Sequence, residues 1–189
     1  MSHVADLETE IRDLLTNESR HSAALTNQAN WYKIVACLDT IGDTEEALEA
    51  FLRTEDRASF GEWYLATYGV MQALFLEQAA VEHLAEAFGL AYNPDEALRD
   101  IRELRNDSIG HPTRRGPPPG KSFSAIARVS VSRTGFRMLT TDGGTAMNTY
   151  RQVNVPDLIS QQRAILARAL GVFLTELKAQ DGIKHESDT

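Results

Sequence analysis

The longest apolar segment of the chain, residues 60–88, is the feature that most limits its fold. Apolar side chains occur nearly all round a helix drawn through this segment, which predicts a central bundle helix of about eight turns. Its main apolar side contains one charged residue, Glu77. A buried carboxylate is costly unless a cation or hydrogen bonds compensate it, so we expect Glu77 to have a partner inside the protein.

Helical periodicity predicts further helices on both sides of this segment. Gly42 is expected to end one of them, and Asp43 with Glu46, like Ser59 with Glu62, has the spacing of a capping box. Asn93 and Pro94 form a strong helix start, with asparagine as the cap and proline in the first turn. The predicted helices cover residues 4–15, 18–41, 43–54, 94–110 and 156–182.

The period of apolar residues changes to two after the proline- and glycine-rich loop at residues 116–120. Residues 125–132 alternate as in a strand, and turns at 133–135 and 142–144 flank a second strand, with a third through Val153. We therefore predict a mainly α fold, a helical bundle with a small antiparallel sheet inserted before the last long helix. The expected organisation is one domain over residues 1–182, with the β insertion at 117–155 and a disordered tail at 183–189.

Composition limits the environment and the partners of the chain. We expect a cytoplasmic protein without a membrane contact, because no apolar run reaches membrane-spanning length and the first residues do not form a signal peptide. The net charge of −8 argues against general nucleic-acid binding. The charge is uneven, however: residues 1–98 carry −13, whereas residues 99–151 carry +6 and contain nine arginines. Arginine is suited to bidentate contacts with phosphate.

Arg105 lies at the centre of this basic part, on an unexpected face of its predicted helix. At 100° per residue it falls among Leu98, Ile101 and Leu104, on the side that should pack. A guanidinium there requires a counter-charge or a polar cleft, and Glu77 is the candidate counter-charge. Pro112 ends the helix and frees His111, a group that exchanges a proton near neutral pH, to converge on the same site.

Other chemistries have little support in the sequence. The loop from Gly116 to Ser122 is one residue short of a phosphate-binding loop, and its three prolines lack the N–H groups that such a loop uses. The five histidines include no pair at helical metal-ligand spacing, and the single cysteine, Cys37, excludes a zinc site built on several cysteines. We expect no metal and no cofactor.

The arrangement of these residues resembles the HEPN superfamily. A long apolar helix is followed by a capped helix that ends in Arg105-Asn106, and five residues, 106–110, separate Arg105 from His111. HEPN domains are all-helical and carry an arginine, a polar residue after it, and a histidine after four to six intervening residues. The resemblance covers residues 60–112 and the final helix; the strands and the acidic first helices lie outside it.

The resemblance implies a metal-independent endoribonuclease that works as a homodimer, as many members of the superfamily do, with RNA or a nucleotide phosphate bound in a cleft shared by the two helices that carry Arg105 and His111. His111 would act as general base or acid on the RNA 2′-hydroxyl and the leaving oxygen, and Arg105 would stabilise charge on the phosphate. Asn106 would orient the pair, and a cyclic 2′,3′-phosphate would result. Some members are toxins or defence components neutralised by a partner protein. The arginines expected to bind RNA phosphates nearby are Arg102, Arg114 and Arg115.

Two other interpretations stay open at the level of sequence. Some members of the superfamily have lost catalysis and serve as dimerisation, nucleotide-binding or partner-binding modules. Alternatively, the motif is a coincidence: Arg105 would lock the bundle through Glu77, and His111 would be a helix-terminal residue that interacts with the helix dipole. Metal-independent RNA cleavage that depends on Arg105 and His111 separates the first interpretation from the other two.

Overall fold

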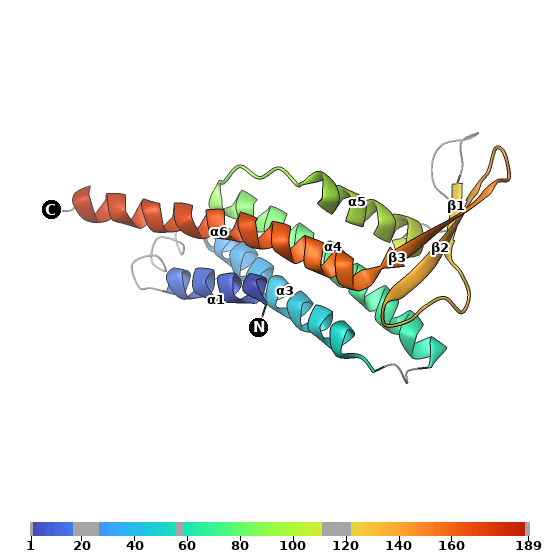
Figure 1. Cartoon of the computed structure of the whole chain (residues 1–189). Helices are drawn as coiled ribbons and strands as arrows, with labels where there is room; N and C mark the ends of the chain where they lie inside the picture. The colour runs from blue at the N-terminus through green and yellow to red at the C-terminus, as the bar shows by residue number, and fades with distance from the viewer. Residues whose placement is uncertain (1, 17–26, 56–58, 111–121, 188–189) are drawn as a thin grey trace. The chain divides into compact units, whose positions relative to one another are not determined.

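The fold is mainly helical, with a three-stranded antiparallel sheet before the last long helix, as the sequence predicts (Figure 1). The computed structural model describes residues 2–16, 27–55, 59–110 and 122–187. The helices are α1 (His3–Thr16), α3 (Gln28–Arg53), α4 (Phe60–Phe88), α5 (Glu96–Arg105) and α6 (Val155–Ser187). A π-helical turn, η1 (Asn106–Gly110), follows α5, and the strands are β1 (Ser122–Ile126), β2 (Gly135–Asp142) and β3 (Asn148–Asn154).

The chain forms two compact units, each assembled from separate segments. Unit 1 comprises residues 1–45, 76–95 and 163–189, and unit 2 comprises residues 46–75 and 96–162. Three helices, α3, α4 and α6, begin in one unit and end in the other. Whether the chain is a single domain stays a prediction.

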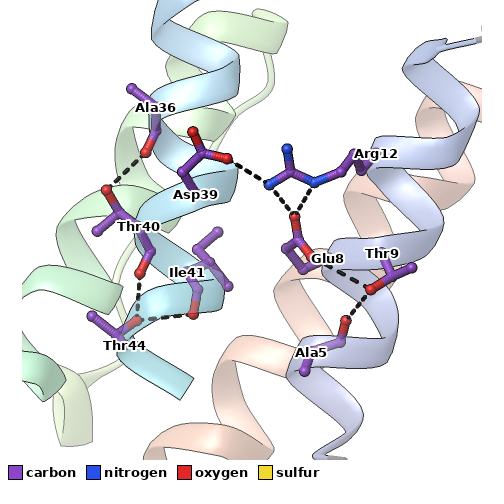
Figure 2. A network of polar contacts seen from close by, with 9 residues as sticks. All are labelled: Ala5, Glu8, Thr9, Arg12, Ala36, Asp39, Thr40, Ile41 and Thr44. Carbon is purple, nitrogen blue, oxygen red and sulfur yellow. Dashed lines mark hydrogen bonds and ion pairs between the residues drawn. The ribbon is translucent and has the colours of Figure 1, made fainter. Parts of the chain in front are cut away.

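In unit 1, an ion pair joins α1 to the first part of α3, and both helices bury apolar residues. Figure 2 shows the Arg12 guanidinium between the carboxylates of Glu8 and Asp39, at N–O distances of 2.7 and 2.9 Å. Burial acts to lower the pKa of Arg12, but hydrogen bonds to Asp39 and Glu8 outweigh it and raise the pKa. The apolar residues of this region repeat at helical spacing and are buried: Val4, Leu7, Ile11, Leu15, Ile34, Cys37, Leu38 and Ile41.

A second charged contact in unit 1 is almost fully enclosed. Arg163 of α6 donates to both carboxylate oxygens of Glu45 on α3, from Nε at 3.1 Å and from Nη2 at 2.7 Å. The Ser2 hydroxyl donates to the same carboxylate at 2.6 Å. Glu45 is only 4% exposed, so this two-point pair replaces the water that the carboxylate loses on folding.

In unit 2 the sheet covers the core with one of its faces. β2 is the central strand and pairs antiparallel with β1 and β3. Side chains alternate between the two faces along each strand, and one face is buried along β1, at the start of β2 and at Val153 of β3, while the opposite face stays exposed or half-buried. The buried face contributes Ile126, Phe136, Met138 and Val153 to a core that also contains Trp63, Val70, Leu74, Ile101, Leu104 and Ile159.

The beginning of α4 confirms the second predicted capping box. The Ser59 N–H donates to the Glu62 carboxylate at 2.6 Å, and the Glu62 N–H donates to the Ser59 hydroxyl at 3.4 Å. The hydrogen bond from the Ser59 backbone holds the pKa of Glu62 below its usual value. The predicted bounds of this helix, residues 60 and 88, are those of the structure.

The first predicted capping box, at Asp43 and Glu46, is wrong. α3 continues through Gly42 to Arg53, and the predicted helices at 18–41 and 43–54 are therefore one helix that begins at Gln28. Glycine inside a helix costs about 1 kcal/mol relative to alanine. Buried Ile41 and Leu48 on either side of Gly42 offset that cost, because packing contributes more to helix stability than propensity does.

Three other boundaries differ from the sequence prediction. α5 begins at Glu96, two residues after Pro94. β1 ends at Ile126, because the chain turns at Val129, whose φ of 55° is incompatible with a strand. α6 runs to Ser187, past Gly182, where we expected a disordered tail.

Candidate functional site around Arg105

The candidate site begins where α5 changes into a π-helical turn. Leu98, Ile101 and Leu104 are buried, and Ile101 and Leu104 fix one face of α5 against the core of unit 2. Arg105 is the last α-helical residue, and residues 106–110 form the wider turn η1. Single π-helical turns are rare and occur frequently at functional sites. In η1, Ser108 is buried and Ile109 packs against the core, so the turn is held against the core of unit 2.

The Arg105 guanidinium is held in place by α4. Its Nε and Nη2 donate to the Gln72 side-chain oxygen at 3.2 and 2.6 Å, and its Nη1 donates to the Asn106 side-chain oxygen at 3.1 Å. The guanidinium carbon lies 4.8 Å from the centre of the Phe75 ring. These contacts fix the plane of the cation, because an aromatic face and a hydrogen-bond acceptor constrain it from different sides.

The acceptors that hold Arg105 are neutral amide oxygens. Within the described part of unit 2, no carboxylate forms an ion pair with this guanidinium. A guanidinium has five N–H donors, and the three hydrogen bonds above use three of them. Within unit 2, two N–H donors of Arg105 therefore stay available for a ligand with oxygen acceptors.

Arg102 lies one turn earlier on α5 and contacts the same aromatic ring. Its guanidinium carbon is 5.6 Å from the centre of the Phe75 ring. Arg102 and Arg105 are three positions apart on α5 and share the Phe75 ring. Both are half-buried. Two cations therefore meet at one aromatic side chain, which concentrates positive charge at this end of α5.

Gly110 allows the end of η1 to approach the Arg105 side chain. A Cβ atom at Gly110 would lie 2.6 Å from Arg105 Nη1 and 3.3 Å from the Asn106 side-chain oxygen. The first distance is too short for any non-bonded contact, so only glycine leaves the guanidinium where it is.

Gly110→Ala is therefore expected to displace the Arg105 guanidinium and to lower the RNA cleavage proposed below by about 100-fold, the effect of a displacement of about 1 Å. The melting temperature should change little, because only the flexible end of one side chain has to move. Cleavage rates and thermal unfolding are the measurements. Gly42→Ala is the matched control, since a Cβ there meets nothing within 4 Å. Full activity of Gly110→Ala would contradict this role of the glycine.

The other predicted site residues are placed only in part. Glu77 is fully buried in unit 1, and its pairing with Arg105 stays a prediction. His111, Arg114 and Arg115 lie outside the described residues, as does the loop at 116–120, so their convergence on Arg105 also stays a prediction. The sequence analysis missed Gln72 and Phe75. No local pattern singles them out, because α4 contains several other polar and aromatic residues.

The residues that the structure describes contain neither a candidate metal cluster nor a candidate membrane span. In the part of the chain that it describes, no three His, Cys, Asp or Glu side chains gather in a way that would hold a metal ion. Along the same residues, no helix combines the length and the apolar character needed to cross a bilayer.

Comparison with known proteins does not assign the chain to a class. No family model matches it, and neither does any curated protein or solved structure. Fold and site define a helical protein with an inserted three-stranded sheet and an arginine held by amide and aromatic contacts at a helix end. The resemblance of the Arg105–His111 segment to the HEPN superfamily stays a prediction.

Proposed function

We propose that this protein is a HEPN-like, metal-independent endoribonuclease in which Arg105 binds the scissile phosphate. The observation that carries the proposal is the way in which Arg105 is held. The uncharged side chains of Gln72 and Phe75 fix its guanidinium, and no described carboxylate of unit 2 forms an ion pair with it. A fixed cation that keeps its charge stabilises the charge that develops on phosphate oxygens in the transition state. His111 is proposed as the general acid or base, and Asn106, which accepts a hydrogen bond from Arg105, as the orienting residue.

The proposal is tested by incubating the purified protein with single-stranded RNA in EDTA. We expect cleavage with cyclic 2′,3′-phosphate ends, because attack by the neighbouring 2′-hydroxyl needs no external nucleophile. Loss of cleavage in both Arg105→Ala and His111→Ala supports the enzyme. If the wild-type protein cleaves no RNA, the alternative holds: a non-catalytic module that dimerises or binds a nucleotide or a partner protein.

We also propose that the protein is a homodimer through the exposed face of α4 in unit 2. Leu65 and Tyr68 are 75% and 49% exposed, an unusual state for large apolar residues, and they share a helix face with Gln72. A second copy seated on this face would cover them and bring two Arg105 side chains toward one cleft. A partner protein that neutralises a toxic nuclease would compete for the same face.

Leu65→Glu is expected to convert the dimer to a monomer, because it places like charges opposite each other at a two-fold interface. Light scattering coupled to gel filtration measures the mass. Val172→Glu, at an apolar residue of α6 that is 58% exposed, is the matched control and should leave the dimer intact. A Leu65→Glu dimer of unchanged stability would contradict the proposed interface.

A further inference from the structure

The exposed face of the sheet in unit 2 carries aromatic side chains, although it faces water. We define this outer face by the side chains that alternate with the buried ones: Phe123, Ala125, Arg137, Leu139, Thr141, Asn148, Tyr150 and Gln152. A strand face exposed to water usually carries polar residues. Here Phe123 is 42% exposed and Tyr150 is 60% exposed, so two aromatic rings face solvent.

The strand register fixes how these rings are arranged. Phe123 pairs with Thr141, and Tyr150 pairs with Leu139, so the rings lie two strands apart and two residues out of step along the strands. The usual spacings of a sheet put their Cα atoms roughly 12 Å apart. The rings are thus too far apart to stack on each other, and each can hold a separate planar group.

Tyr150 is already stacked against a cation. The guanidinium carbon of Arg137, on the neighbouring strand, lies 5.0 Å from the centre of the Tyr150 ring. The guanidinium lies over the ring, so a positive charge is held next to an exposed aromatic side chain. Aromatic rings and arginine planes are the groups on which proteins stack unpaired bases, and a nearby arginine binds the phosphate between them.

The charge around the outer face favours a polyanion. Residues 122–154 contain four arginines and a single acidic residue, Asp142. Asp142 points to the other face by register, and its carboxylate accepts hydrogen bonds from the backbone of Gly144 and Thr145 and from the Thr145 hydroxyl. These bonds hold the pKa of Asp142 below its usual value. The outer face itself contains Arg137 and no carboxylate.

We propose that the outer face of the sheet binds single-stranded RNA, with one base on Tyr150, another on Phe123 and a phosphate at Arg137. Unpaired bases are required, because the bases of a duplex are stacked on each other and do not offer their faces to a ring. β1 contacts η1, so this surface belongs to the same compact unit as Arg105. The site goes beyond the proposed cleavage and stands on its own, since binding does not require turnover.

Binding is measured by fluorescence anisotropy with a labelled ten-nucleotide oligouridine and, for comparison, a blunt duplex RNA of the same length. The Arg105→Ala variant is used as the background, so that cleavage does not consume the probe. We expect binding of the single strand and weaker binding of the duplex. Tyr150→Ala and Phe123→Ala should each weaken single-strand binding by roughly 5- to 150-fold, the range for loss of one stacked base. Tyr150→Phe should retain it.

Met147→Ala is the matched control, because Met147 is an apolar residue of the same hairpin, 65% exposed, without a ring. It should bind RNA like the background protein. Equal affinity of all variants for oligouridine would overturn the proposal. So would a change of mass in Tyr150→Ala without a change in RNA affinity, since the outer face would then bind a protein. If the wild-type protein bound oligouridine but cleaved no RNA, the proposed ribonuclease activity would be wrong and the proposed RNA-binding site would stand.

Discussion

Arg105→Ala is expected to lower the rate of metal-independent RNA cleavage by roughly 100- to 1,000-fold, the effect of removing one preorganised donor from a developing oxyanion. The guanidinium is fixed by Gln72 and Phe75 before substrate arrives, so little reorganisation is required when charge develops on the phosphate. Arg105→Lys should recover only a small part of the rate, because an ammonium group does not reproduce the planar set of donors. Initial rates on a single-stranded RNA in EDTA measure the effect.

Arg99→Ala is the control for this experiment. Arg99 lies on the same helix, is exposed and carries the same charge. Its replacement should leave the cleavage rate within about twofold, because a screened surface charge contributes little. Circular dichroism of Arg105→Ala must show the wild-type helical content, since Arg105 also contacts α4. A folded Arg105→Ala variant that cleaves RNA at the wild-type rate would exclude Arg105 from the reaction.

Glu45→Ala is expected to lower the free energy of unfolding by about 3–5 kcal/mol, because it removes the carboxylate that balances the charge of the half-buried Arg163 guanidinium and accepts two of its hydrogen bonds. Urea unfolding followed by circular dichroism measures this change. Glu45→Gln should be less damaging, since the amide keeps one acceptor, but it removes the charge that balances Arg163.

Two variants test whether this effect is electrostatic. In the double variant Glu45→Leu with Arg163→Met, both charges are replaced by apolar groups, and most of the lost stability should return. Glu86→Ala breaks an exposed pair with Lys33 in the same unit and should leave the denaturation midpoint nearly unchanged. If Glu45→Ala unfolded at the wild-type urea concentration, the buried pair would have no net role in stability.

Local patterns were sufficient to predict much of the fold. The helix at residues 60–88 was predicted to the residue, because the capping box at Ser59 and the long apolar run are both local signals. Proline in the first turn likewise marked the start of α6, and the turn at residues 142–144 marked the hairpin between β2 and β3. These features depend on interactions between residues a few positions apart, so they can be predicted from the sequence alone.

The errors have a common cause. Gly42 and the capping pair after it predicted a helix end, but buried contacts on both sides carry α3 through this point. Alternation predicted a strand through Val131, whereas the chain turns at Val129 so that Val131 enters the core of unit 2. In both places packing between distant residues outweighs a local preference of about 1 kcal/mol.

The sequence by itself determined the helices, the sheet before the last helix, and the arginine on the packing side of α5. Only the tertiary structure decided what holds that arginine: amide oxygens of Gln72 and Asn106 and the ring of Phe75, with Gly110 leaving room for the guanidinium. It also decided that Phe123 and Tyr150 share the exposed face of one sheet. The physical reason is that helical and strand periodicity are properties of neighbouring residues, whereas Gln72 and Phe75 lie 33 and 30 positions from Arg105, and the fold alone brings such residues together.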